Sequence, residues 1–143
     1  HCDYHPGNLK FEDEKVIGIF DFDWSKVDYR LFDVALALVY FTSVWDDQAT
    51  ELRPDKFTLF LSAYNKACLR LSRINPLSKQ ERSHLIPMLS IANLYVLNWD
   101  LVDFYDTPNQ NDDDYYSYIH HNIGLVRWIA RHIDKLKGWV NKS

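Results

Sequence analysis

Two short apolar runs near the beginning of the chain, residues 8–11 and 15–20, constrain its fold more than any other feature. The charged residues 12–14 separate them, and this is the pattern of a β-hairpin with a polar turn. An antiparallel hairpin brings the residues before its first strand next to the residues after its second strand. Polar side chains at those two places are therefore expected to share one small region of space.

Polar residues do occupy both places. Before the first strand, Asp3 and Asn8 lie in one short segment with a Pro-Gly pair between them, which indicates a loop and not a helix. After the second strand, Asp21 leaves the apolar run. The hairpin geometry can bring Asp3, Asn8 and Asp21 together.

The rest of the chain has the apolar periodicity of helices. Residues 31–45 predict a helix that is buried on most sides, and residues 54–73 predict a second one that begins at Pro54. Ser78 and Glu81 form a capping box for a third helix, residues 107–114 indicate a loop, and apolar positions from 119 to 136 define a last amphipathic helix. Three aromatic side chains lie at helical spacing among aliphatic residues: Tyr95, Trp99 and Trp128. They are expected to pack in the core, and the alternative, in which they form aromatic walls of a substrate site, is the minor one.

Composition narrows the class of protein. The chain has 143 residues and 47% hydrophobic residues, enough for one core, and its net charge of −4 gives no broad reason to bind nucleic acid or an anionic membrane surface. With only Cys2 and Cys68, a disulfide framework is not expected, so a reducing, cytoplasmic location is the default. The longest apolar run, residues 34–41, is far shorter than the roughly 20 residues that cross a bilayer, so a soluble chain without membrane contact is expected.

Three ordered motifs resemble a known family. Residues 1–8 read His-Cys-Asp-Tyr-His-Pro-Gly-Asn, residues 19–24 read Ile-Phe-Asp-Phe-Asp-Trp, and residues 28–35 read Asp-Tyr-Arg-Leu-Phe-Asp-Val-Ala. The order is similar to that of protein-kinase-like phosphotransferases, and it resembles the aminoglycoside phosphotransferase and choline kinase branch more closely than the protein kinases. The close match covers residues 1–35, while the helical remainder agrees in general character.

The resemblance implies a role for each residue of the motifs. Asp3 would be the catalytic base that orients the acceptor hydroxyl, and Asn8 and Asp21 would bind the cofactor by holding Mg²⁺ against the phosphates of ATP. His1 would support the loop structurally, and Asp33 would hydrogen-bond its backbone.

Three further features have both a structural and a functional interpretation. Asp23 either joins the metal shell or caps a turn, and His5 either lines the substrate pocket or shapes the loop. The acidic residues 112–114 could meet a cationic substrate, but they are expected to form a solvated loop that leads into a helix N-terminus.

The implied fold is mainly α (α+β): the C-terminal-lobe portion of a protein-kinase-like fold, with a short β-hairpin that carries the catalytic and metal-binding loops and a bundle of about four or more helices. A single domain is expected over residues 1–143, with the catalytic loop, hairpin and metal-binding segment in residues 1–28 and the helical part in residues 29–143. The N-terminal lobe is expected to be absent, because the chain opens directly on the catalytic loop and has no glycine-rich phosphate loop. Such a piece would bind ATP poorly alone, and it could self-associate through the apolar surface exposed by truncation.

The implied activity is transfer of the γ-phosphate of ATP to a hydroxyl of a small metabolite, a class that includes amino sugars, choline or ethanolamine, homoserine and methylthioribose. Two other functions remain open. One is a kinase-like binding module without catalysis. The other is a metal-dependent phosphohydrolase, whose site would combine acidic and histidine ligands: His1, Asp3, His5, Asp21 and Asp23.

Overall fold

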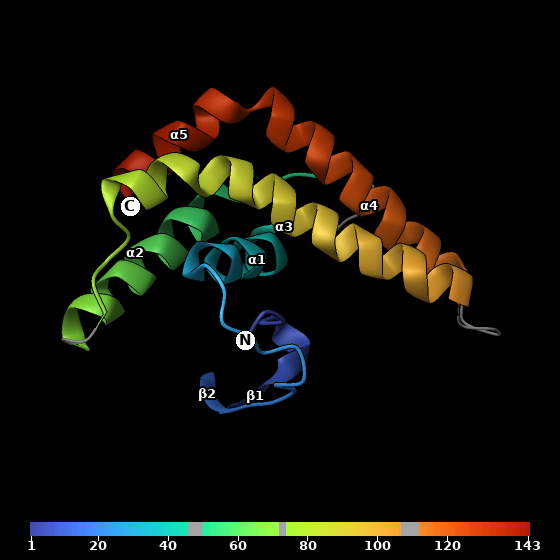
Figure 1. Ribbon diagram of the computed structural model, residues 1–143, viewed down its shortest axis with the longest axis horizontal. Helices are drawn as coiled ribbons and strands as arrows, with labels where there is room; N and C mark the ends of the chain where they lie inside the picture. The colour runs from blue at the N-terminus through green and yellow to red at the C-terminus, as the bar shows by residue number, and fades with distance from the viewer. Residues whose placement is uncertain (46–49, 72–73, 107–111) are drawn as a thin grey trace.

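The computed structural model describes residues 1–45, 50–71, 74–106 and 112–143 (Figure 1). In these residues a short 3₁₀ turn and a two-stranded antiparallel sheet precede five α-helices. The elements are η1 (Pro6–Asn8), β1 (Leu9–Glu12), β2 (Lys15–Ile19), α1 (Arg30–Thr42), α2 (Pro54–Arg70), α3 (Lys79–Asp106), α4 (Asp112–Arg131) and α5 (Ile133–Lys142). The predicted fold class, mainly helical with a small β-hairpin, is confirmed.

The hairpin pairs Leu9 with Ile19 at its open end, beside the loop that precedes β1. Its turn residues Asp13 and Glu14 have φ angles of 44° and 62°, the left-handed backbone that a tight two-residue hairpin turn requires. The hairpin lies at one end of the molecule, below the helices in Figure 1, and its apolar side chains are mostly exposed. Its structural contribution is therefore to join the two loops at its open end.

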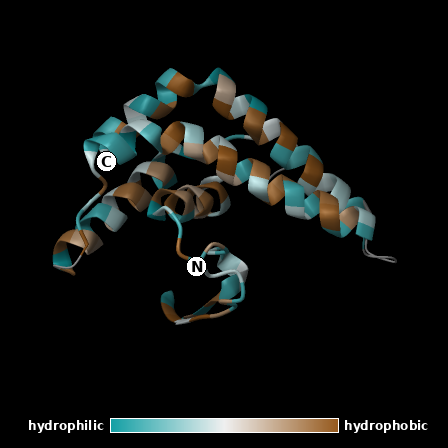
Figure 2. Cartoon of the chain, viewed as in Figure 1, coloured by the Kyte–Doolittle hydropathy of each residue, from teal (hydrophilic) through white to brown (hydrophobic). Residues whose placement is uncertain are grey.

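Helix α1 is the centre of the core. The apolar colour is concentrated along it in Figure 2, and it packs against α2 and α3. Nine of its side chains are buried: Leu31, Phe32, Val34, Ala35, Leu36, Ala37, Leu38, Val39 and Thr42. The predicted helix buried on most sides is confirmed, and it ends at Thr42, three residues earlier than expected.

Helices α3 and α4 form a long antiparallel pair (Figure 1), and α3 packs against α1. The predicted capping box is present, because the Glu81 amide donates to Ser78 Oγ at 3.2 Å and the Ser78 amide donates to Glu81 Oε2 at 2.7 Å. By length and composition alone, α3 could cross a membrane. The uninterrupted apolar runs of the sequence did not indicate this, because the apolar residues of α3 are interrupted by polar ones. In this structure α3 packs against α1 and α4.

The last part of the chain corrects two expectations. Residues 119–136 do not form one helix, because α4 ends at Arg131 and α5 begins at Ile133 after a break at His132. The break lets α4 pack along α3 while α5 turns to reach α2. Residues 112–114, expected in a loop, form the first turn of α4. Residues 107–111 lie outside the described residues.

Arg30 ties the beginning of α1 to the beginning of α3. Its guanidinium donates to both carboxylate oxygens of Glu81, at 2.6 and 2.7 Å, and to the backbone oxygen of Asn75 at 2.5 Å. Arg30 holds the pKa of Glu81 down to about 2, mainly through these hydrogen bonds. The Arg30–Glu81 pair thus fixes α1, the first helix after the hairpin, against α3.

Replacing Glu81 with Gln tests this tie. Because the folded pKa of Glu81 lies below its unfolded value, its carboxylate stabilises the folded state above about pH 4. That stabilisation is lost as the pH falls through about 2. Glu81→Gln should therefore lower the melting temperature at pH 7 by a few degrees, about 2–8 °C, and the difference from wild type should shrink at pH 3. A difference that stays constant between pH 7 and pH 3 would contradict the ionic contribution.

Candidate active site

The loop before the hairpin is held by its own histidine. His5 Nδ1 accepts a hydrogen bond from the Gly7 amide at 3.1 Å, and the His5 carbonyl accepts one from the Asn8 amide at 3.1 Å. These bonds form η1 and place Asn8, which is buried, at the entry to β1. His5 Nε2 also lies 3.5 Å from Asp3 Oδ2, so the loop-shaping residue also contacts the predicted base.

Asp3 and Asn8 are in direct contact. Asn8 Nδ2 donates to Asp3 Oδ2 at 2.7 Å and to the Asp3 carbonyl at 2.9 Å. Both amide hydrogens are used toward Asp3, so the amide orientation is fixed and Asn8 Oδ1 faces the other way. The contact orients the Asp3 carboxylate and leaves the side-chain oxygen of Asn8, Oδ1, available to a ligand.

Asp21 is brought to the same place by the hairpin. The Phe20 amide donates to the Asn8 carbonyl at 2.9 Å, and the Phe20 carbonyl is hydrogen-bonded by His1 Nε2 at 2.9 Å. Asp21 follows directly with a φ of 56°, a left-handed backbone that is uncommon for residues other than glycine and that occurs often at functional sites. The Asp21 side chain is exposed at the open end of the hairpin.

Asp33 connects this assembly to the core. Its Oδ1 accepts a hydrogen bond from the Cys2 amide at 2.8 Å, so the carboxylate at the beginning of α1 holds the backbone next to Asp3. The His1 ring packs against Tyr4 and Phe22, with ring centroids 5.9 and 4.7 Å apart. His1 and Asp33 thus contact the loop, and their supporting role stays a prediction.

The side chains of Asn8 and Asp21 have the chemistry of ligands for a hard divalent cation. No three His, Cys, Asp or Glu side chains are grouped as a metal cage in the part of the chain that the structure describes. Asn8 and Asp21 offer hard oxygen atoms, and Mg²⁺ takes few protein ligands and keeps several waters. Asp23 is exposed, and the structure places it two residues beyond Asp21 without a hydrogen bond to the loop.

A cavity of about 260 Å³ opens at Asp3. It is lined by four aromatic and two acidic side chains: Asp3, Trp24, Tyr40, Tyr95, Trp99 and Asp103. Tyr95 and Trp128 pack against the core, as expected, and Tyr95 also lines this cavity together with the half-buried Trp99. Helical periodicity cannot separate these cases, because a cavity wall lies on the same face of a helix as the core.

The sequence did not indicate Trp24, Tyr40, Asp100 or Asp103. The sequence did contain one signal for a site on α3: Asp100 and Asp103 are acidic, lie one helical turn apart and follow Trp99. Asp100 is half-buried and accepts a hydrogen bond from Asn122 Nδ2 at 2.7 Å. The pKa of Asp100 is raised to about 6, mainly by burial and to a smaller extent by the nearby Asp103, while the Asn122 hydrogen bond opposes this change.

The ionised Asp100 should cost stability. Asp103 on α3, Tyr40 on α1 and Asn122 on α4 face its carboxylate. Because the folded pKa lies above the unfolded value, stability is highest below the unfolded pKa and falls as the pH rises through about 6. Asp100→Asn keeps an oxygen for Asn122, so it should raise the melting temperature at pH 8 by about 2–5 °C and change it little at pH 4. A lower melting temperature at pH 8 would contradict the burial penalty.

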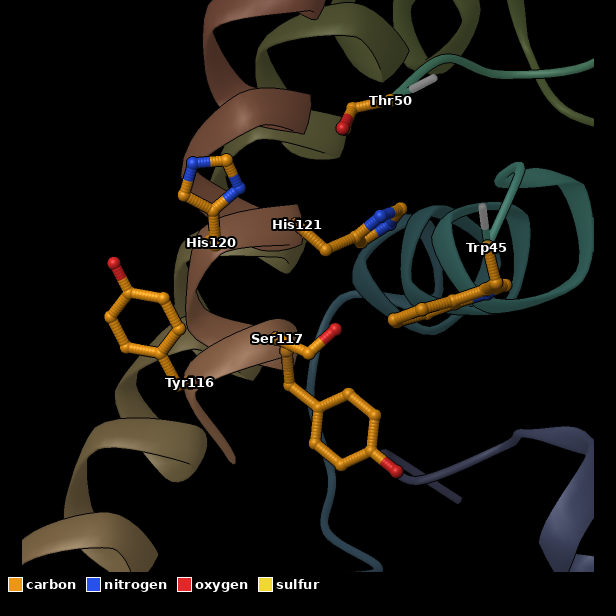
Figure 3. Close-up of a pocket in the computed structure, with 7 residues that line it drawn as sticks. Trp45, Thr50, Tyr116, Ser117, His120 and His121 are labelled. Atoms are coloured by element: carbon orange, nitrogen blue, oxygen red, sulfur yellow. The ribbon is translucent and has the colours of Figure 1, made fainter. Parts of the chain in front are cut away.

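A second cavity, of about 460 Å³, lies between the end of α1 and the first half of α4 (Figure 3). The His121 ring stacks on Trp45 with centroids 4.0 Å apart, and the Tyr116 and His120 side chains point away from that stack in Figure 3. Burial lowers the pKa of His121 to about 4, so its ring is neutral at pH 7. Among the residues that the structure describes, those that line this cavity include no carboxylate.

The segment that contains the loop and the hairpin is similar to known proteins. The family model described as "Phosphotransferase enzyme family" matches residues 1–69, which include the loop, the hairpin, α1 and most of α2. A homoserine kinase of Afipia carboxidovorans is 30% identical over 109 residues, which are 76% of this chain and 30% of the relative. The chain therefore spans about 30% of the length of that relative. No solved structure matches the chain.

The matched segment contains every residue of the loop and hairpin assembly described above. These two similarities support the assignment of residues 1–69 to a phosphotransferase family of the aminoglycoside phosphotransferase type.

Proposed function

We propose that the complete protein carrying this chain is a kinase that transfers the γ-phosphate of ATP to a hydroxyl of a small molecule. The observation that carries this proposal is the contact of Asp3 with Asn8 at the mouth of a cavity, with Asp21 next to the residue that bonds the same loop. Phosphoryl transfer depends on a positioned hydroxyl and on charge neutralisation at the phosphate, and these three residues can supply both.

Asp3 is the base in this mechanism. The acceptor hydroxyl donates a hydrogen bond to the Asp3 carboxylate, which points its oxygen at the γ-phosphorus. The new O–P bond forms as the bond between the γ-phosphorus and the bridging oxygen breaks, ADP leaves, and the hydroxyl proton passes to Asp3 late in the step. Asn8 Nδ2, at 2.7 Å from Asp3 Oδ2, keeps the carboxylate in the orientation that this requires.

Asn8 Oδ1 and the Asp21 carboxylate would hold magnesium. The metal, when bound, neutralises charge on the phosphate oxygens of the nucleotide. Asn8 contributes a neutral oxygen and Asp21 a negative one, so the site keeps a net positive charge for the phosphates. Because the chain spans 30% of the homoserine kinase relative, we propose that most contacts to ATP come from other parts of the complete protein.

The phosphohydrolase alternative has less support. It needs His1 and His5 as metal ligands, but His5 Nδ1 accepts from the Gly7 amide, so Nε2 carries the proton of the neutral ring. His1 Nε2 bonds the Phe20 carbonyl, and the remaining ring nitrogen of His1, Nδ1, is buried. It also leaves no role for Asn8, which is buried against Asp3. The structure therefore favours a magnesium-dependent transferase over a histidine-ligated hydrolase.

The test measures ADP formation by the complete protein with ATP, Mg²⁺ and a panel of small alcohols, amino alcohols and amino sugars. We expect ADP release that depends on one class of alcohol and that stops when EDTA removes the metal. ADP release that is independent of every alcohol, or supported by Zn²⁺ but not by Mg²⁺, would favour the hydrolase. No nucleotide binding at all would favour the binding module.

A further inference from the structure

We infer that the outer face of α3 is a homodimer interface, in which α3 of one copy of the protein packs in parallel and in register against α3 of a second copy. Five exposed side chains define this face, which we call the α3 stripe: Ile91, Leu94, Asn98, Leu101 and Tyr105. The inference does not depend on the proposed phosphotransfer, because the stripe lies on the side of α3 that faces away from the candidate active site.

The α3 stripe lies opposite the side of the helix that packs inside the molecule. Successive residues of a helix are rotated by about 100° around its axis. The inward side is given by Leu89 and Val96, which are buried, and by Trp99, which lines the cavity of the candidate site. Ile91 and Tyr105, by contrast, are 52% and 77% exposed. The stripe is therefore an outer surface of the part of the chain that the structure describes.

The stripe has the spacing of a coiled-coil seam. Its members are separated by three, four, three and four positions, which is the heptad spacing in which alternate positions, a and d, face a partner helix. Ile91, Asn98 and Tyr105 occupy the a positions, and Leu94 and Leu101 occupy the d positions. In parallel coiled coils, a β-branched residue at a with leucine at d favours two strands. The stripe therefore matches a parallel, two-stranded pair.

The sequence around the stripe lacks the charges expected on the outside of a helix. A surface helix normally carries charged residues on its outer side, yet residues 85–99 contain none. The half-buried Leu97 and the exposed Val102 flank the seam and widen its apolar surface. Single exposed apolar residues are ordinary, but a continuous apolar row marks an interaction surface.

Asn98 points to a second copy of the same helix as the partner. On an unrelated apolar surface its exposed amide would be buried without a hydrogen-bond partner, which costs free energy. In a parallel pair in register, each a residue faces the same residue of the other copy, so the two Asn98 amides can hydrogen-bond to each other. The two-fold symmetry also makes each apolar residue of the stripe face its own copy, so the surface is complementary to itself.

The affinity of this dimer should be low. The stripe covers about two heptads, which is about 21 Å of helix. Interfaces that bury less than about 1,200 Å² belong mostly to weak and transient complexes. We therefore expect a dissociation constant on the order of 1–100 µM.

Sedimentation velocity of the complete protein over about 1–200 µM tests for the dimer. We expect a concentration-dependent equilibrium between monomer and dimer. Leu94→Glu places two carboxylates opposite each other in the seam and should raise the dissociation constant at least about tenfold. Leu59→Glu makes the same change on an exposed leucine of α2 and should leave the dissociation constant unchanged. A monomer at every concentration, or a dimer that Leu94→Glu does not weaken, overturns the inference.

Cysteine crosslinking tests the parallel register. In a parallel pair, Leu94→Cys and Leu101→Cys each face their own copy within the reach of a disulfide, about 7 Å between Cα atoms. In an antiparallel pair that aligned one of these positions, the two copies of the other would lie about 21 Å apart. Both variants should therefore give oxidised dimers, whereas the wild type, with its buried Cys2 and Cys68, should give none. Crosslinking of one variant alone, or of neither, contradicts the parallel register.

Replacing Asn98 tests whether it specifies the pair. Asn98→Ile should tighten association at least about tenfold and allow trimers to form, because an apolar a position no longer selects two strands. A role of Asn98 in the monomer alone would change the melting temperature and leave the oligomeric state as in wild type. That result would overturn the assignment of a second copy as the partner.

Two other occupants of the stripe give different results. By length and composition α3 could cross a membrane, so binding of the monomer to phosphatidylcholine vesicles, lost in Leu94→Glu, would assign the stripe to a lipid surface and overturn the dimer. A lower melting temperature of Leu94→Glu in a protein that stays monomeric would show that another segment of the complete protein covers the stripe, which also overturns the dimer. These measurements do not use kinase activity, so failure of the dimer and failure of the proposed function are distinguishable.

Discussion

Asp3→Asn should abolish most phosphoryl transfer and leave the fold intact. The asparagine side chain has the shape of aspartate and still offers an oxygen to Asn8 Nδ2, which donates to Asp3 Oδ2 at 2.7 Å. It is neutral, so it can neither take the hydroxyl proton nor hold the hydroxyl by a charged hydrogen bond. We expect kcat to fall by about 10²–10⁴-fold with little change in KM for the acceptor, because the lost interaction acts in the transition state.

Asp134→Asn is the matched control for this experiment, since Asp134 is an exposed carboxylate that contacts only Lys137 among the described residues. Its kcat should stay within about twofold of wild type, as expected for a surface change away from the site. Melting temperatures of both variants should remain close to that of wild type. If Asp3→Asn retains near-normal kcat while folded, Asp3 is not the base and the proposed mechanism is wrong.

Phe57→Ala should cause the largest loss of stability of any single change considered for this chain. Phe57 in α2 is 0% exposed, and its ring centroid lies 5.5 Å from that of Trp139 in α5. Truncation leaves a cavity where α2 and α5 meet, and the free energy of unfolding should fall by about 3–5 kcal/mol. Denaturation by urea, followed by circular dichroism, measures this loss directly.

Leu59 provides the control on the same helix, because it is 64% exposed while Phe57 is completely buried. Leu59→Ala should change the free energy of unfolding by no more than about 0.5 kcal/mol. A loss below about 1 kcal/mol for Phe57→Ala would show that α5 does not pack on α2 as described. Equal losses for both variants would indicate that the burial pattern of α2 is rotated.

The local features of the fold were predictable from the sequence because neighbouring residues determine them. The capping box of Ser78 and Glu81 involves residues one turn apart, and the hairpin follows from two apolar runs with a polar turn. Helix α1 was predictable because an almost continuous apolar stretch has to be buried on most sides. The break at His132 was not, since it depends on α5 turning toward α2, and apolar spacing alone continues through it.

The candidate site also has one part that was predictable from the sequence and one part that was not. The contact of Asp3 with Asn8 lies within one short loop, so the order of residue types was enough to predict that they meet. The cavity at Asp3 depends on residues from three distant segments, including Trp24 after the hairpin and Tyr40 on α1. Only the packing of α1, α3 and α4 shows that Trp99 and Asp103 face Asp3. From the sequence of α3 alone, Trp99 would be assigned to the core and Asp103 to the surface.

The central claim is that Asp3, Asn8 and Asp21 form a centre that moves phosphate from a nucleotide to an alcohol. Phosphorus NMR of the complete protein with ATP, Mg²⁺ and choline or ethanolamine tests this claim most directly. The γ-phosphate resonance should decline as a phosphomonoester of the added alcohol appears in equal amount, together with ADP, and Asn8→Ala or Asp21→Asn should suppress both. Appearance of inorganic phosphate in place of an ester, whatever alcohol of the panel is added, would contradict the claim.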